Sequence, residues 1–277
     1  MDKHFELTDK FIINAFGIKL LQIKCTRKIK HADVGDLGGY IEKEDNLYGD
    51  AWVSDNAWVS GDAKVSGNAK VYGDAKVYGN AKVYGDAKVY GDAKVYGDAK
   101  VSGNAQVYDN AWVSGNAKVY DNAWVSGNAQ VYGNAQVYGD AKVYGDAKVS
   151  GDAWVSGNAQ VSGDAKVYGD AWVSGDAKVS GDAWVSGDAQ VSGNAQVSGD
   201  AKVSNNNEHC GFDCFGSANR HTHAYKTQSG KVEIICGCFR GSIEEFEEQV
   251  KKTHQGNEFE RQYMAIAEVI KIKLGLK

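Results

Sequence analysis

A valine stands at every sixth position from Val53 to Val203, 26 times without a break. Each six-residue unit reads valine, tyrosine or serine, glycine or aspartate, aspartate or asparagine, alanine, and then lysine, glutamine or tryptophan. Self-similarity at a fixed period is the signature of a solenoid, whose stacked units bury a continuous core that no single unit could bury alone.

The spacing within one unit predicts its geometry. Alanine and valine are separated by one residue, so they share one face of a short strand, while Lys76 and Tyr78 around Val77 face the other way. The following glycine and Asp or Asn predict a corner, because glycine tolerates positive φ and Asx side chains bond to the local backbone. Three units close one triangular coil, so the 26 units predict about nine coils.

This pattern resembles the hexapeptide-repeat family, which folds as a single-stranded left-handed parallel β-helix. The family's aliphatic position matches Val53 through Val203, and its small position matches Ala51, Ala57 and each later alanine. The residue after the aliphatic one departs from the family, since it is Tyr or Ser here and often Gly or an acid there. The left hand is implied by the resemblance alone, because ordinary crossovers are right-handed.

The limits of the repeat divide the chain into three expected parts. Residues 1–46 form a small N-terminal β cap, residues 47–204 the β-helix, and residues 205–277 a C-terminal α+β module with two helices. Caps are needed because a solenoid has open strands at both ends. Leu47 and Ile41 extend the six-residue register upstream. The predicted fold class is therefore mainly β.

Short apolar runs predict the elements of the two end parts. Strands are expected at residues 11–13 and 18–23 before the repeat, and at 223–227 and 231–236 after it. Residues 242–245 (Ser-Ile-Glu-Glu) form a capping box that predicts the start of a helix.

The pattern after the capping box predicts a pair of helices with apolar core faces. The first helix carries Ile243, Phe246 and Val250 on one side, and Gly256–Asn257 is expected to end it. The second helix has apolar residues at helical spacing: Phe259, Tyr263, Ile266 and Ile270.

Three segments outside the repeat carry a second resemblance. Residues 34–42 (VGDLGGYIE), residues 236–241 (CGCFRG) and residues 253–257 (THQGN) are similar to segments of uncharacterised hexapeptide-repeat proteins of phages, prophages and gut bacteria. The second and third belong to a C-terminal module of unknown function, matched over residues 216–272. The resemblance implies a phage or prophage setting and no activity.

Composition limits the partners. The formal net charge is −5, and residues 50–204 hold 13 Lys and 18 Asp with no Arg or Glu. No basic field is present to attract nucleic acid, and no apolar stretch is long enough to span a membrane. The N-terminus does not read as a secretory signal, and five cysteines fit a reducing compartment. A cytoplasmic or virion-associated protein is expected.

Residues 18 apart are neighbours on one face of such a coil, which predicts ladders. One ladder consists of four lysines, expected to be a solvated face offset by Asp62 and Asp98, with an anion-binding ladder as the alternative. Its members are Lys64, Lys82, Lys100 and Lys118.

All seven tryptophans lie in the repeats just before an inward valine, so each is expected to point outward. Trp154 and Trp172 are 18 residues apart and should stack as a contact surface for a second subunit, a protein or a glycan. The alternative is scattered rim aromatics lying over lysine stems. Arg220, Tyr225 and Arg240 in the C-terminal part complete the candidate contact surface, since Arg and Tyr are common anchors.

A cluster of His and Cys in the C-terminal part raises the question of zinc. The spacings are CxxxC, HxH and CxC rather than the usual CxxC pairs. We expect no metal, with buried thiols and surface histidines, while a zinc site remains the open alternative. The residues concerned are His209, Cys210, Cys214, His221, His223, Cys236 and Cys238.

Acyl transfer is the best-known activity of hexapeptide β-helices and uses a His base on a coil and usually an inserted loop. Residues 50–204 contain no His, Cys, Glu or inserted loop, and no Thr ladder of the kind that binds ice. The sequence favours a non-enzymatic scaffold or binding protein without a cofactor, forming a homo-oligomer such as a trimer with a protein or glycan partner. The alternative is a transferase-like enzyme with an unrecognised site in the C-terminal module.

Overall fold

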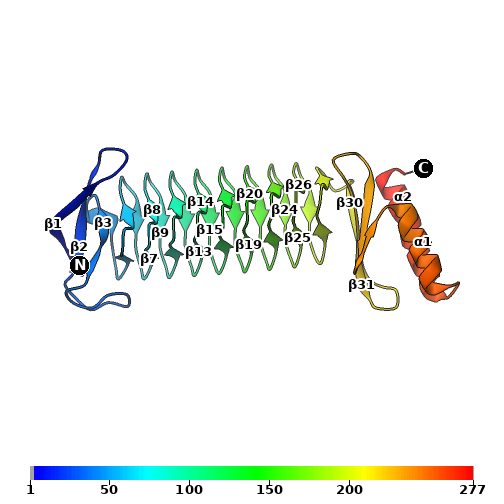
Figure 1. Cartoon of the computed structure of the whole chain (residues 1–277), viewed down its shortest axis with the longest axis horizontal. Helices are drawn as coiled ribbons and strands as arrows, with labels where there is room; N and C mark the ends of the chain where they lie inside the picture. The colour runs from blue at the N-terminus through cyan, green and yellow to red at the C-terminus, as the bar shows by residue number, and fades with distance from the viewer. Residues whose placement is uncertain (1–2, 277) are drawn as a thin grey trace. The chain divides into compact units, whose positions relative to one another are not determined.

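The computed structural model describes residues 3–276 and divides the chain into two compact units, Met1–Asp152 and Ala153–Lys277. The first unit holds an N-terminal sheet and a stack of coils, and the second holds further coils and a C-terminal α+β module (Figure 1). Neither helix in the described part of the chain has the length and apolarity needed to cross a membrane.

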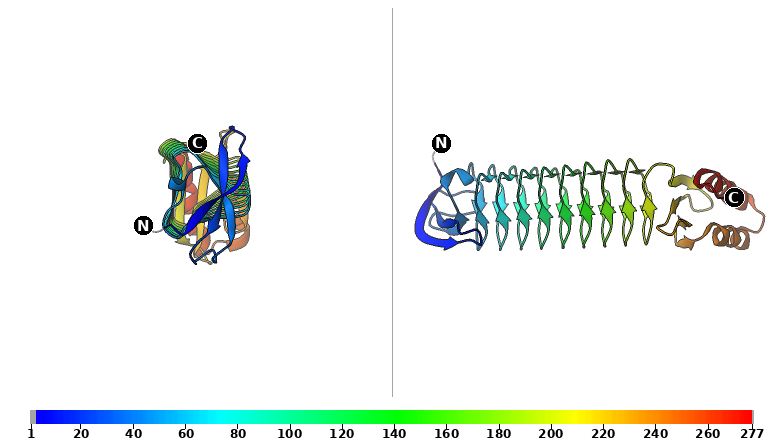
Figure 2. Two further views of the ribbon diagram at one scale, coloured as in Figure 1. Left: turned by 90° about the vertical axis from the view of Figure 1, so that its left-hand side faces the viewer. Right: turned by 90° about the horizontal axis from the view of Figure 1, so that it is seen from above.

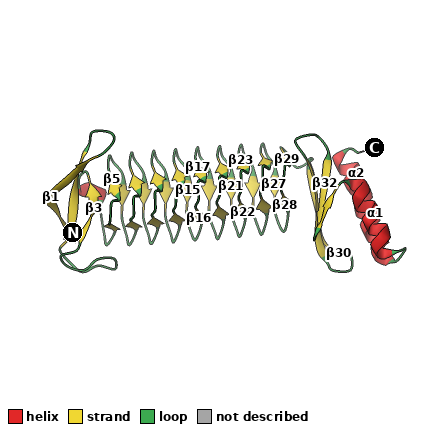
Figure 3. Ribbon diagram, in the orientation of Figure 1, coloured by secondary structure: helices red, strands yellow, loops and turns green. Residues whose placement is uncertain are grey.

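The coils are built from 26 two-residue strands, β4 (Trp52–Val53) to β29 (Lys202–Val203), each made of a valine and the residue before it (Figure 3). Within the first compact unit, strands three hexads apart pair in parallel, so Val89 lies between Val71 and Val107. In the second unit, Val173 lies in the same way between Val155 and Val191. The expected parallel β-solenoid of about nine turns is confirmed.

The interior of the coils contains only alanine and valine from the repeat. Val53 through Val203 have no exposed surface, and of the repeat alanines only Ala195 has any. Each buried valine contributes about 1.5–3 kcal/mol before the cost of ordering the chain is subtracted. The inward Ala-x-Val pair inferred from the spacing is therefore confirmed.

The corners of the coils require glycine, because the backbone there is left-handed and packs closely against the next coil. Gly61 has φ 67°, and a Cβ there would lie 3.0 Å from the carbonyl oxygen of Gly79 in the next coil. Asp55 takes the glycine position in its six-residue repeat, at φ 58°. Its carboxylate accepts the amide hydrogen of Gly73 at 3.0 Å. That hydrogen bond offsets part of the cost of positive φ in a residue with a Cβ.

Asparagine and aspartate side chains connect successive corners along the first unit. Asn80 Nδ2 donates to Asp98 Oδ1 at 3.0 Å, and Asn134 Nδ2 donates to Asp152 Oδ1 at 2.9 Å. Asp98 is thus engaged by an amide, while Asp62 pairs at 2.7 Å with Lys43, which precedes the coils. Both carboxylates expected to offset the lysine ladder therefore have partners other than those lysines.

The N-terminal sheet continues the hydrogen-bond ladder of the coils. Strands β1 (Phe5–Ile13) and β2 (Lys19–Cys25) are antiparallel, and β3 (Leu37–Ile41) pairs with β2 on one side and in parallel with β5 (Trp58–Val59) on the other. The sheet lies at the end of the coils of the first unit (Figure 2). A short 3-10 turn, η1 (Glu44–Asn46), follows β3.

The first two tryptophans do not point into solvent, contrary to the expectation for all seven. Trp52 and Trp58 are 2% and 6% exposed. His4 lies beside Trp52, and Leu20 packs with Trp58. The hexad pattern directs both indoles away from the coil interior, and the N-terminal sheet then covers them.

The C-terminal module is a four-stranded antiparallel sheet with a helical hairpin on one face (Figure 1). Strands at 223–227 and 231–236 were predicted, whereas the first and last strands were not. The elements are β30 (His209–Phe215), β31 (Arg220–Lys226), β32 (Val232–Cys236), β33 (Phe239–Gly241), α1 (Ile243–His254) and α2 (Glu258–Leu274).

The first helix begins as its capping box predicts, but it ends differently. Ser242 accepts the amide hydrogen of Glu245, and the Glu245 carboxylate accepts that of Ser242. The helix ends at His254 with Gln255 at φ 46° in the left-handed position, so Gly256 is not the capping residue. Asn257 instead caps the start of α2, with its side chain accepting two amide hydrogens.

Candidate functional site

Two tryptophans of the second unit stack as the 18-residue spacing predicts. Trp154 and Trp172 occupy adjacent parallel strands, β21 (Trp154–Val155) and β24 (Trp172–Val173). Their rings lie 4.9 Å apart at 17°, and Trp172 is 44% exposed. The pair forms an exposed apolar patch on an otherwise polar face of the coils, and such patches are common at binding surfaces.

Other aromatic and lysine side chains on the coils contact one another. Tyr72, Tyr90 and Tyr108 stack at 4.8 and 5.0 Å, and burial in this stack raises the pKa of Tyr90 to about 12. The expected lysine ladder also forms, with Lys100 between Lys82 and Lys118 on neighbouring strands.

A shallow hollow of about 580 Å³ lies beside another exposed tryptophan in the first unit. Its lining includes Asp92, Trp112 and Asn128, and Lys94 lies 4.6 Å above the Trp112 ring. Because the polar side chains around this hollow recur from coil to coil, they give no single catalytic constellation.

The C-terminal sheet has two different faces because successive residues of a strand alternate in direction. Ala224, Ile234 and Cys236 pack against the helices. His223 and Tyr225 face the other way and contact the last coils through Gln196 and Ser198. The sheet therefore lies between the coils and the helical hairpin in the second unit.

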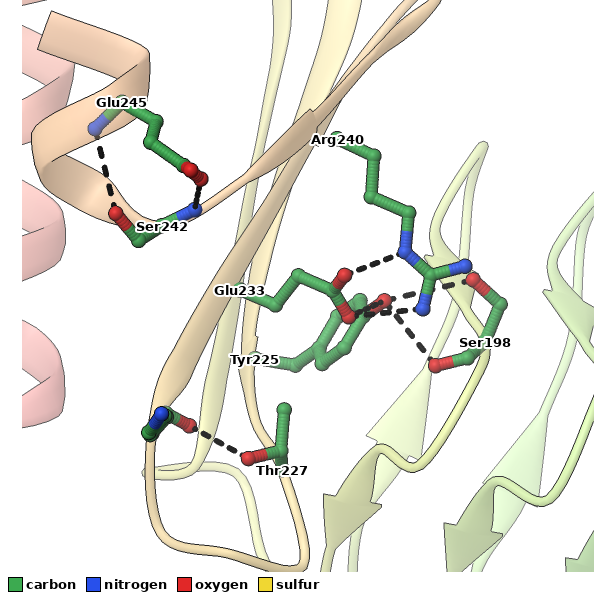
Figure 4. A network of polar contacts seen from close by, with 8 residues as sticks. Ser198, Tyr225, Thr227, Glu233, Arg240, Ser242 and Glu245 are labelled. Atoms are coloured by element: carbon green, nitrogen blue, oxygen red, sulfur yellow. Dashed lines mark hydrogen bonds and ion pairs between the residues drawn. The ribbon is translucent and has the colours of Figure 1, made fainter.

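Tyr225 is the centre of a polar network at this junction (Figure 4). Its hydroxyl lies 3.2 Å from the carbonyl oxygen of Ser198 and 2.9 Å from the carboxylate of Glu233. Arg240 makes two hydrogen bonds to Glu233, one of them at 2.9 Å. Burial raises the pKa of Tyr225 to about 12, so the phenol stays protonated as a hydrogen-bond donor.

This network changes how the three candidate residues of the module are placed. Tyr225 has no exposed surface, so it holds the junction and is not available to an external partner. Arg240 extends its guanidinium over Gly199 of the last coils while it pairs with Glu233. Arg220 is exposed at the start of β31, packed against Gly237.

Three histidines cluster on the coil side of the sheet, where we expected surface histidines. His223 is 1% exposed, its Nδ1 lies 2.8 Å from the carbonyl oxygen of Gln196, and its Nε2 lies 3.1 Å from Nδ1 of His209. His221 Nδ1 lies 2.7 Å from the Asp213 carboxylate. Burial lowers the pKa of His209, and it lowers the pKa of His223 to about 3.

The thiols do not join these histidines. Cys236 is buried on the helix side of the sheet, where it accepts a hydrogen bond from Thr222 at 3.1 Å. Cys210 packs on the same side, and burial raises its pKa to about 11, while Cys214 and Cys238 are exposed. Within residues 3–276, no three His, Cys, Asp or Glu side chains are arranged to hold one metal ion.

The sequence contained a signal for the histidine cluster. Residues 221, 223 and 225 alternate along one strand, so they share a face. The partner strand β30 was not predicted, because its sequence is rich in Cys, Gly and Asp rather than in β-branched residues. Sequence reasoning therefore missed both His209 as the partner of His223 and the coil carbonyl groups opposite them.

Comparison with protein families identifies the repeat. Residues 105–118, 117–133 and 159–175 match the family model described as the YdcK beta solenoid repeat. These segments lie within the hexads of the two units and include neither end module. No curated protein matches the chain. The matched repeats and the stacked parallel strands together make this chain a repeat β-solenoid protein.

Proposed function

We propose that this chain is a non-enzymatic scaffold of the left-handed hexapeptide type, which presents a contact surface on its coils and a C-terminal recognition module. The observation that carries the proposal is the Trp154–Trp172 stack, a large apolar patch on coils whose other outward groups are mostly polar or contact one another. The resemblance of residues 34–42 and 236–257 to phage and gut-bacterial proteins supports a phage or prophage setting.

The partner that this surface fits best is a second copy of the chain. Aromatic residues are enriched at the centre of interfaces. In a symmetric homo-oligomer the same tryptophan pair of each copy would lie at the same height around the symmetry axis. A trimer is the arrangement expected from the hexapeptide resemblance. Arg220, exposed on the C-terminal module, remains a candidate contact for a protein or glycan.

The histidine cluster favours the scaffold over a transferase. A general base must present a free ring nitrogen to a substrate. Both nitrogens of His223 have partners within the fold, and the Nε2 atoms of His209 and His221 are buried.

Sedimentation of the full chain tests the proposal. We expect wild-type protein to sediment as a homo-oligomer and Trp154→Ala/Trp172→Ala to sediment as a monomer. Trp112→Ala/Trp124→Ala is the matched control, because it removes two exposed indoles from the first unit, and it should leave the oligomer intact. A monomeric wild-type protein that binds acetyl-coenzyme A saturably would overturn the scaffold in favour of the transferase.

A further inference from the structure

The hydrogen bonds of His209 and His223 fix the protonation of both rings. The carbonyl oxygen of Gln196 can only accept, so the His223 nitrogen 2.8 Å away, Nδ1, carries a hydrogen. In neutral His223 the Nε2 atom is then unprotonated, and it accepts a hydrogen bond from Nδ1–H of His209 at 3.1 Å. The chain of donors therefore runs from His209 through His223 to the coil.

We propose that the C-terminal module is an acid-releasable cap, docked on the last coils while His209 and His223 are both neutral. A proton added to Nε2 of His223 would face the N–H of His209. Either two donors would then meet, or His209 would have to move its hydrogen to Nε2, which is buried without a hydrogen-bond partner. The charge would also be buried between the sheet and the coils, where burial of an unpaired charge is costly. This inference is independent of what the module or the coils bind.

The charged groups around the pair offset only part of that cost, because Glu208 raises the pKa of His209 by less than burial and Lys273 lower it. Asp213 accepts from His221, and Glu208 accepts the amide hydrogen of Ser204 at 2.7 Å. Lys273 of α2 adds a positive charge near His209 and contributes to the lowering of its pKa.

The remaining groups that face His223 on the same side of the sheet are also engaged. His221 lies 5.8 Å from His223 between ring centres and disfavours a second positive charge. Tyr225 is protonated, and Glu233 is paired with Arg240.

The direction of the pH effect follows from these pKa values. A histidine in an undocked, solvated module titrates near its ordinary pKa of about 6.5. In the docked state burial lowers the pKa of His209, and it lowers that of His223 to about 3. Docking is therefore strongest above about pH 6.5. As the pH falls below that value, each of these histidines weakens docking by up to about tenfold per pH unit, and for His223 this continues down to about pH 3.

Release would expose a sheet edge. In the docked state Gln228 N–H donates to the carbonyl oxygen of Asp200 at 2.8 Å, and Ala201 forms an antiparallel bridge with Thr227. These backbone groups of the last coil would lose their partners. Open strand edges pair readily with other chains, so the released state is also expected to associate end to end.

Hydrogen exchange of the full chain between pH 7.5 and 4.5, corrected for the intrinsic rate, tests the proposal. Below pH 6, residues 186–226 should lose protection by up to about tenfold per pH unit for each of the two histidines. The coils at residues 105–133, in a stretch without histidine, should keep theirs and serve as the internal control. Unchanged protection at 186–226 down to pH 4.5, or an equal loss in the coils, would overturn the proposal.

His209→Asn sharpens the test because asparagine keeps a donor near the Nδ1 position but does not titrate. Its loss of protection should begin at lower pH and be about tenfold less steep per pH unit than in the wild type. His31→Gln, which removes a partly buried histidine of the loop between β2 and β3, is the matched control and should follow the wild-type profile at residues 186–226. A wild-type profile in His209→Asn would contradict the role of the histidine pair.

Discussion

The two ends of this protein close their coils in different ways. At the N-terminal end, β3 pairs with β5, so the sheet continues the ladder of the coils, and Trp58 packs with Leu20 in an apolar cluster. At the C-terminal end, the module has its own core, and side chains such as Tyr225 reach backbone carbonyls of the last coils. The first end is fused to the repeat, whereas the second is docked on it. Substitutions that make the backbone clash should therefore destabilise the N-terminal end most. Substitutions that remove polar side-chain partners should destabilise the C-terminal end most.

The largest effect is expected from Gly39→Ala at the fused end. A Cβ on Gly39 would clash with the carbonyl oxygen of Ala57 and would lie 2.8 Å from Val53 Cγ1. Because strand backbone cannot move aside cheaply, we expect a loss of about 3 kcal/mol in the free energy of unfolding, measured by urea denaturation.

Gly199→Ala is the matched substitution at the docked end. There the new Cβ would meet the guanidinium of Arg240, which is the flexible end of a side chain, although φ at Gly199 is +64°. The expected loss is about 1–2 kcal/mol, mainly from the left-handed backbone. A larger loss at Gly199 than at Gly39 would break the distinction between fused and docked ends.

Tyr225→Phe should have an intermediate effect confined to the docked end. The change removes a buried hydroxyl that bonds to Ser198 and Glu233 and leaves their oxygens without that donor. We expect a loss of about 1–3 kcal/mol, measured as faster hydrogen exchange at residues 196–204. Tyr96→Phe, which keeps the ring stack with Tyr78, should change stability by less than about 0.5 kcal/mol.

The smallest effect is expected from Lys43→Ala, which removes an ion pair between the segment after β3 and the first coils. The hydrogen bond from Lys43 lowers the pKa of Asp62, so the pKa of Asp62 should rise toward its ordinary value in a carboxyl NMR titration. Because both side chains are solvated, the urea midpoint should stay unchanged. A clear shift of the midpoint would show that surface charge, and not backbone continuity, holds the fused end.

Much of the fold was predictable because it depends on local chemistry. The six-residue valine period determines the coils, glycine permits the left-handed corners, and the Ser242 capping box starts α1. The left hand of the solenoid did not follow from local chemistry in this way, since it was inferred from the resemblance alone. The end of α1 was wrong by one residue because Gln255 adopts the left-handed position next to Gly256.

The placement of the site residues depended on contacts between distant segments, so it was less predictable. Trp154 and Trp172 were correctly expected to stack, because their spacing equals one coil. Trp58 and Tyr225 were expected at the surface and are buried, since each is covered by a segment that packs on a coil end. The repeat pattern carries no information about which coil faces the end modules will cover.

The tautomers of the histidines at the two ends provide the most direct test of their different chemistry. At the fused end, His4 and His31 approach coil carbonyls with Nε2 at 2.9 Å, so both should carry hydrogen on Nε2. At the docked end, His209, His221 and His223 should carry hydrogen on Nδ1. A ¹⁵N spectrum of the imidazole nitrogens at neutral pH should therefore show two Nε2–H and three Nδ1–H rings among these five. The Nε2–H form in His209 and His223 would contradict the docked cap.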